Sequence, residues 1–143
     1  MALYISPALP AGTTADDPAV MFFSDFYRTS DNPDAHGVYV DQFTPDASVA
    51  MGSIKVEGQA AISAVRKGMW EKVAARHHAV HQIYPFGSGT NEYMLHGVVN
   101  YTAKDGSKSG KEWAAHAVLV PGAEGKLKLK LYHVYLDTAP PKA

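Results

Sequence analysis

The chain contains no cysteine among its 143 residues, which excludes disulfides, thiol nucleophiles and thiolate metal sites. It also lacks an excess of either charge, because 13 Lys and Arg residues stand against 14 Asp and Glu residues. No basic cluster occurs beyond a few alternating lysines near the C-terminus, so we expect neither nucleic acid nor a membrane surface as a partner. The absence of cysteine is compatible with a reducing compartment, and we expect a cytoplasmic protein.

Long apolar runs are absent as well, and no run approaches the ~20 residues that span a bilayer. The first twelve residues are mildly apolar, but prolines interrupt them and no basic segment precedes them. We therefore interpret residues 1–16 as a flexible N-terminal tail rather than a signal peptide, and residues 139–143 as a flexible C-terminal tail. The length of the segment between them, residues 17–138, suits a single domain with one core.

The C-terminal half of the chain has the pattern of four consecutive antiparallel strands. From Arg76 to Asp137, segments rich in β-branched and aromatic residues alternate with turn residues, as strands and hairpins do. In the last segment Lys126, Lys128 and Lys130 alternate with leucines. Because successive side chains of a strand point to opposite faces, one face of this sheet is solvated and the other is buried.

Closing each hairpin over its turn residues predicts the strand pairing, and a slip of one residue would reverse the faces. The expected pairs are Tyr84 with Tyr93, His78 with Val99, Tyr101 with Trp113, and Trp113 with His133. With these pairs, the inward face collects Arg76, His78, Val99, Tyr101, Trp113, Leu129, His133, Tyr135 and Asp137. The outward face collects His77, His81, His96, His116 and the lysines.

The N-terminal half has the pattern of three helices and a short hairpin. Asp17 followed by Pro18 is a helix start, and Asn32 followed by Pro33 repeats it. The second helix is expected to run to about Phe43, the hairpin covers residues 47–57, and the third helix runs over about 59–75. Helices that precede an antiparallel meander predict an α+β fold, a curled antiparallel sheet that forms a cone-shaped half-barrel over three N-terminal helices.

Four segments resemble the SnoaL-like branch of the nuclear transport factor 2-like superfamily. They read FFSDFYRTSDNPD, FTPDASVAMGSIKVEGQAAI, MWEKVAARHH and KLKLYHVYLD, and the resemblance covers about residues 17–137. It implies the cone-shaped, cystatin-like α+β barrel of scytalone dehydratase and ketosteroid isomerase, usually dimeric through the outer sheet face. The superfamily includes dehydratases, isomerases, epoxide hydrolases and cyclases that use no metal or organic cofactor, and also members without known catalysis. It therefore specifies the fold better than the reaction.

His78 is the first candidate for proton transfer, because the predicted pairing turns it toward the pocket and imidazole is the usual acid or base near neutral pH. The resemblance to scytalone dehydratase-like proteins implies such a role for a His early in this strand. His77 and His78 both match that position, and the face argument selects His78. The alternative is a buried structural histidine bonded to a neighbour.

The further candidate catalytic groups are Tyr27, His133 and Asp137. His133 and Asp137 share the predicted inward face, and a carboxylate beside an imidazole fixes its tautomer. A solvated surface carboxylate is the alternative for Asp137. The resemblance implies that Tyr27 positions a water or a substrate carbonyl. It also implies a helix-end acid at Asp31, which a simple capping residue would explain equally well.

The remaining pocket residues are expected to bind substrate or close the cavity. We treat Arg76 first as structural, paired with Asp31, Asp41 or Asp137, since a buried Arg is rarely unpaired. Aromatic rings such as Trp113 can stack on a flat ligand, and a tyrosine hydroxyl can orient it. The predicted substrate-binding residues are Tyr39, Met51, Trp70, Arg76, Val99, Tyr101, Trp113 and Tyr135.

Neither a metal nor a cofactor is expected. On a helix, the run from His77 to His81 would place two imidazoles on one face for zinc. On a strand these two residues stand about 13 Å apart, and no third ligand follows at a suitable spacing.

The outward face suggests a partner surface. His81, His96 and His116 are either solvated or part of a polar interface, and the resemblance favours a homodimer through this face. The predicted function is a cofactor-free lyase or isomerase, of dehydratase or cyclase type, for a hydrophobic oxygenated small metabolite of secondary metabolism. The alternative is a non-catalytic ligand-binding or dimerising module of the same fold.

Overall fold

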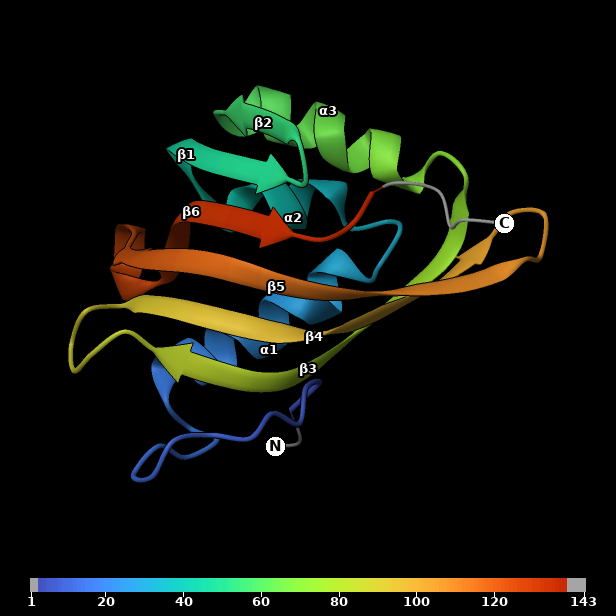
Figure 1. Cartoon of the computed structure of the whole chain (residues 1–143). Helices are drawn as coiled ribbons and strands as arrows, with labels where there is room; N and C mark the ends of the chain where they lie inside the picture. The colour runs from blue at the N-terminus through green and yellow to red at the C-terminus, as the bar shows by residue number, and fades with distance from the viewer. Residues whose placement is uncertain (1–2, 139–143) are drawn as a thin grey trace.

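The computed structural model describes residues 3–138 and shows a six-stranded sheet that curls around three helices without closing (Figure 1). The helices are α1 (Pro18–Ser30), α2 (His36–Asp41) and α3 (Gln59–Trp70), with a short 3-10 turn η1 (Ala123–Gly125). The strands are β1 (Phe43–Met51), β2 (Ile54–Glu57), β3 (Val73–Pro85), β4 (Glu92–Ala103), β5 (Lys108–Pro121) and β6 (Leu127–Tyr135). Their order is β2-β1-β6-β5-β4-β3, and every neighbouring pair is antiparallel except β1 with β6. The predicted α+β fold is confirmed.

The first helix starts where the sequence predicts. The Asp17 carboxylate accepts hydrogen bonds from the backbone N–H groups of Ala19 and Val20, which satisfies donors that the first turn leaves free. One face of α1 is buried against the concave side of the sheet, and it consists of Ala19, Val20, Phe23, Ser24, Phe26, Tyr27 and Ser30. This face anchors the helix over the strands that carry the site.

The other two helices are shorter than predicted. Asn32 caps a turn, accepting from the N–H of Asp34, and α2 begins only at His36. The third helix ends at Trp70 because Val73 already pairs with Ala103 in β4. Sheet hydrogen bonds thus replace the last predicted turn of that helix.

The pairing of β3, β4 and β5 keeps the predicted faces with two corrections. His78 pairs with Val99 as predicted, but a bulge at His81 shifts the next residues, so Tyr84 lies opposite Met94 rather than Tyr93. Trp113 lies opposite Gly97, and Tyr101 opposite Ser109. The predicted pair of Tyr101 and Trp113 was therefore wrong by four residues, an even number that leaves both side chains on the inward face.

The prediction for β6 was wrong in its second half. Leu119 pairs with Leu129, whereas Val118 pairs with Leu131, so Lys130 is an extra residue in the strand. Such a bulge reverses the alternation beyond it. Leu129 is buried as predicted, but Tyr132 and Val134 follow it inward and His133 and Tyr135 point outward.

Residues 3–16, within the segment interpreted as a flexible tail, run along the β3 edge of the sheet (Figure 1). Ala8 forms a parallel bridge with Gln82, and Ile5 is buried. The backbone N–H of Tyr4 donates to the Ser24 hydroxyl at 2.8 Å. The predicted C-terminal tail, 139–143, lies outside the described residues. Within residues 3–138, no helix is long and apolar enough to cross a membrane.

Candidate active site

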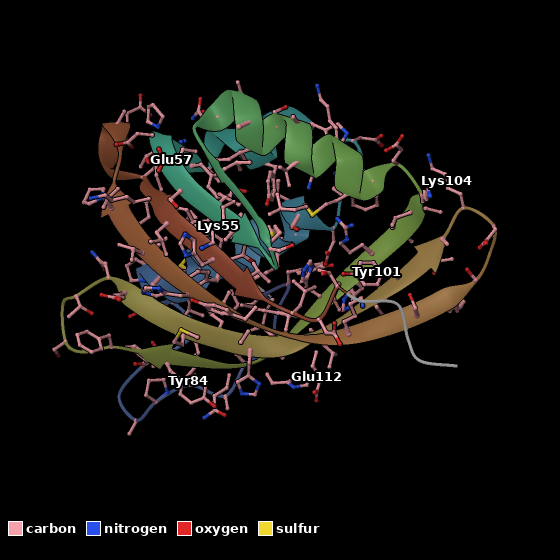
Figure 2. The ribbon with its side chains drawn as sticks, turned by 45° about the horizontal axis from the view of Figure 1, so that its top comes forward. Lys55, Glu57, Tyr84, Tyr101, Lys104 and Glu112 are labelled. Atoms are coloured by element: carbon pink, nitrogen blue, oxygen red, sulfur yellow. The ribbon has the colours of Figure 1, made fainter. Side chains whose placement is uncertain are left out.

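A cavity of about 420 Å³ opens inside the curve of the sheet, within the range of small-molecule sites. Figure 2 shows Tyr101 inside this curve, whereas Tyr84 and Glu112 lie on its convex side. The cavity wall includes His78 and six of the eight residues predicted to bind substrate, namely Tyr39, Met51, Arg76, Val99, Tyr101 and Trp113.

Three rows of paired residues across β3, β4 and β5 build the floor of the cavity. One row joins His78, Val99 and Lys111, and the next joins Arg76, Tyr101 and Ser109. Paired residues share a face, and rows two residues apart are separated by about 7 Å along a strand. The imidazole and the guanidinium therefore project into the same cavity from adjacent rows.

The third row joins Val80, Gly97 and Trp113. A Cβ atom on Gly97 would lie 1.8 Å from the carbonyl oxygen of Ala79, a distance that no side chain tolerates. Glycine here lets β3 and β4 approach closely beneath Trp113, whose buried Nε1 has no hydrogen-bond partner among the described residues.

His78 is bound to Asp31 at the end of α1. Asp31 Oδ1 lies 2.6 Å from His78 Nδ1, and Oδ2 accepts the His78 backbone N–H at 2.9 Å. The Tyr4 hydroxyl donates to Oδ2 at 2.5 Å. An ionised carboxylate only accepts hydrogen bonds, so Nδ1 carries the proton and Nε2 is the basic nitrogen. The exposed fractions of the His78 and Asp31 side chains are 15% and 5%, and His78 lines the cavity whereas Asp31 lies behind it.

Tyr27 is fully buried and does not line the cavity. Its ring packs against His78 and Trp113, with centroids 5.1 and 5.3 Å away, and its hydroxyl lies 2.9 Å from the hydroxyl of Tyr132. Burial raises the pKa of both phenols well above the ordinary value. Tyr132, and not Tyr27, lines the cavity. The sequence analysis therefore selected the tyrosine that lies behind the cavity-lining residue rather than that residue itself.

The contacts of Arg76 differ from the predicted pairing with an acidic residue. Its Nη2 donates to the Met69 carbonyl at 2.8 Å, and its guanidinium lies 4.6 Å from the Trp70 ring and 5.4 Å from the Tyr101 ring. Burial lowers its pKa. Trp70 packs against this guanidinium and is absent from the residues of 3–138 that line the cavity.

The cavity lining within residues 3–138 does not include three residues that were predicted to face it, His133, Tyr135 and Asp137. His133 Nε2 lies 2.9 Å from the Ser48 hydroxyl on the outer side of the sheet, and burial, followed by the neighbouring His116, lowers its pKa. Tyr135 is 55% exposed. Asp137 is exposed beyond the strand, where its carbonyl accepts from Lys111. The bulge at Lys130 is the cause, because it turns Tyr132 and Val134 inward instead.

The sequence analysis did not decide whether Asp31 is a site residue or a capping residue, and it did not identify Tyr4 or Tyr132. The helix-end acid was visible at Asp31, but its partner His78 lies 47 residues away. For Tyr132, the signal is the adjacent apolar pair that it forms with Leu131, which breaks the alternation of the strand. Tyr4 carries no local signal, since it lies in a segment with the composition of a tail.

The other histidines lie away from the cavity. His77 is exposed and its ring approaches that of Tyr4 at 5.6 Å. On the convex face the rings of His81 and His96 lie 5.9 Å apart, and His116 bonds to Glu92 at 2.6 Å. Within the described chain, no three His, Asp or Glu residues are grouped as a metal site requires.

The sequence matches no protein-family model and no curated protein. Solved structures do match. Nuclear transport factor 2 from Cryptosporidium parvum superposes with a TM-score of 0.70 at 16% identity, over 92% of this chain and 100% of that one. ActVI-ORFA from Streptomyces coelicolor gives 0.66 at 23% identity, over 85% and 97%.

A third structure, from Novosphingobium aromaticivorans DSM 12444 and provisionally named a scytalone dehydratase, gives a TM-score of 0.66 at 15% identity, over 85% of both chains. At these identities the similarity concerns the fold. Together with the helix order and the curled sheet, it shows that the chain has the fold of the nuclear transport factor 2-like superfamily.

Proposed function

We propose that the protein is a cofactor-free lyase or isomerase for a hydrophobic, oxygenated small molecule, with His78 as the proton-transfer residue. The observation that carries this proposal is His78 in the wall of a largely apolar cavity, with Asp31 bound to its Nδ1 from behind. A carboxylate on Nδ1 fixes the tautomer that leaves Nε2 as a base and stabilises the imidazolium formed when a proton is taken. The similar structure that is provisionally named a scytalone dehydratase supports the proposal, because a protein with the same fold carries the name of a dehydratase.

The proposed reaction begins when His78 Nε2 removes a proton from a carbon next to a carbonyl group. Tyr132 donates a hydrogen bond to the carbonyl oxygen, on which negative charge develops, while Tyr27 donates to Tyr132. In a dehydration, the imidazolium then protonates a departing β-hydroxyl, so that one C–H and one C–O bond break, a C=C bond forms and water leaves. In an isomerisation, the proton returns to a different carbon.

The cavity wall is suited to such a molecule. Apolar side chains include Met51, Val99 and Val134, and hydroxyl groups are supplied by Tyr101 and Tyr132. Apolar walls exclude water, and a few placed donors orient oxygen atoms of the ligand. Raised phenol pKa values keep both tyrosines protonated, and hence able to donate, at neutral pH.

Proton abstraction can be tested without knowing the natural substrate. Bicyclic ketones such as 2-tetralone carry exchangeable protons next to the carbonyl, and NMR in D₂O measures their replacement by deuterium. We expect the protein to accelerate exchange and His78→Gln to reduce the acceleration by about 10²–10⁴-fold. His77→Gln is the matched control, because His77 points to the opposite face of the same strand, and it should exchange like the wild type.

A ligand-binding module without catalysis is the second candidate, and the cavity itself supports it. It predicts that the ketones bind and shift the ring resonances of His78, while deuterium exchange stays at the rate in buffer. Exchange that persists in His78→Gln, or that is lost in His77→Gln, contradicts the assigned base.

A further inference from the structure

The charges around the cavity are all of one sign. Lys72, Arg76 and Lys111 line it, whereas among the described residues no Asp or Glu does. This contrasts with the chain as a whole, whose formal net charge is −1. Asp31 lies behind His78, where its oxygens already accept from that residue and from Tyr4. The cavity therefore combines apolar walls with charged side chains that are all cationic.

Arg76 is the cation held in a fixed position. The rings of Trp70 and Tyr101 lie against its guanidinium, and the Met69 carbonyl accepts from one Nη2 hydrogen. The carboxylate that acts on its charge, Asp31, already accepts hydrogen bonds from His78 and Tyr4. A guanidinium has five N–H donors, so several remain for a ligand, and a partly buried charge gains most from an opposite charge.

The position of Arg76 relative to His78 sets the spacing of the ligand's groups. The two residues occupy alternate positions on β3, about 7 Å apart, and both line the cavity. Tyr101 and Ser109 share the row of Arg76, and their hydroxyls add donors beside the guanidinium. A ligand group bound at the Arg76 guanidinium lies about one ring length from the ligand carbon atom next to His78.

We propose that the molecule bound in this cavity carries a carboxylate, which Arg76 binds with the help of the Tyr101 and Ser109 hydroxyls while the reacting carbon lies at His78. The planar fork of a guanidinium matches a carboxylate. Arg76 is held in place by its contacts with Met69, Trp70 and Tyr101, and one fixed guanidinium suits a single negative charge better than a phosphate dianion, which needs more donors. This inference rests on the proposed function and narrows its substrate class to hydrophobic keto or hydroxy acids.

The test compares 2-naphthoate with 2-naphthamide, which has nearly the same shape and no charge. Calorimetric titration should show the wild type binding the carboxylate at least tenfold more tightly than the amide. Arg76→Gln should remove this preference by weakening the carboxylate and leaving the amide nearly unchanged. Arg28→Gln is the control for loss of a positive charge, because Arg28 is on the exposed face of α1, paired with Asp25.

Arg76→Lys provides a second variant in case the Gln variant folds poorly. It keeps the charge and loses the fork, so the preference should fall to an intermediate value. The inference is overturned if the wild type binds acid and amide equally, if Arg76→Gln or Arg76→Lys retains the full preference, or if 2-naphthyl phosphate binds more tightly than 2-naphthoate.

The two proposals fail in different ways. Equal binding of acid and amide, together with His78-dependent deuterium exchange, removes the carboxylate site and leaves the catalytic proposal standing. A preference that depends on Arg76 but occurs without any exchange establishes the anion site and removes the catalysis. Failure of both naphthyl compounds to bind, together with absence of exchange, removes both.

Discussion

Asp31 binds both the side chain and the backbone of His78, with one carboxylate oxygen 2.6 Å from Nδ1 and the other 2.9 Å from the backbone nitrogen. The contact joins the end of α1 to β3. It fixes the position of the strand and the orientation of the imidazole at the same time. The Tyr4 hydroxyl adds a third hydrogen bond to this carboxylate, so the N-terminal segment also contributes to the site.

Asp31 is therefore expected to act as a positioning residue. In Asp31→Asn the amide retains the shape but can donate to Nδ1, which moves the imidazole proton to Nε2 and removes the base. We expect deuterium exchange to fall by about 10²–10⁴-fold, while 2-naphthoate affinity changes little. ¹⁵N NMR of the imidazole reports the tautomer directly. A variant with full exchange activity, or one whose Nδ1 stays protonated, contradicts this role.

Arg66 is expected to dominate the stability of the helical layer. It is 1% exposed, and its guanidinium donates to the carbonyls of Thr29, Ser30 and Asn32 and to His36 Nδ1. These carbonyls lie at or just beyond the end of α1, where acceptors are left without helical partners.

Arg66→Met should reduce the free energy of unfolding by about 3 kcal/mol or more, because hydrogen bonds to a charged group are worth about 1.5–3 kcal/mol each and several are lost together. Urea denaturation measures the loss. Arg28→Met is the control, since that arginine is half exposed and an exposed pair contributes at most about 1 kcal/mol. Equal losses in the two variants would show that the buried network is not stabilising.

The sequence predicted the fold and the face of His78 because both depend on local patterns. The Asp17 cap, the apolar spacing of α1 and the strand alternation are each readable within a few residues. The same reasoning misplaced Tyr84, since neither the length of the β3–β4 loop nor the bulge at His81 has a clear signature. The assumed loop length and the missing bulge each shift the predicted register by one residue, and the two shifts cancel at His78.

The missed features arise from contacts between distant segments. The bulge at Lys130 follows from pairing β6 with both β5 and β1, and no single strand specifies that pairing. Arg66 did carry a signal, because it is spaced four residues from both Ile62 and Trp70 on the buried face of α3. Its partners are backbone carbonyls, which the sequence does not display.

Buried tyrosines predict a loss of stability at alkaline pH. Burial raises the pKa of Tyr27 and Tyr132, and raises that of Tyr39 to about 12. In the unfolded chain a tyrosine ionises near pH 10. Above that pH the unfolded state binds fewer protons than the folded state, so stability should fall by up to about 1.4 kcal/mol per pH unit for each buried tyrosine.

Tyr27→Phe tests this relation. At pH 8 the variant loses the hydrogen bond to Tyr132 and should be less stable by about 1 kcal/mol. From pH 10 upward it has one fewer buried phenol, so its stability should decline less steeply than that of the wild type and the two curves should converge. Urea denaturation between pH 8 and 11 gives both curves, and parallel curves would contradict the pKa assignment for Tyr27.

The convex face of the sheet is expected to form a homodimer. It carries three exposed large side chains, Tyr84, Met94 and Tyr135, and the Tyr84 ring stacks on His96 at 5.6 Å. Light scattering at micromolar concentration should give roughly twice the mass of the chain. Met94→Glu, which puts a charge on this face, should yield a monomer. Met21→Glu is the matched control, because Met21 is similarly exposed, at 43% against 39%, but lies on α1.

The dimer should also weaken below about pH 6, since imidazoles ordinarily gain a proton near pH 6.5. The convex face carries the neighbouring rings of His81 and His96, so protons gained there would place like charge on both copies. Measuring the dissociation constant at pH 7.5 and 5.5 separates this effect from the apolar contribution. A dimer with the same constant at both pH values, but still disrupted by Met94→Glu, would place the interface on the convex face away from the histidines. A monomer at both pH values, or a dimer that Met21→Glu disrupts and Met94→Glu does not, would remove the convex face as the interface.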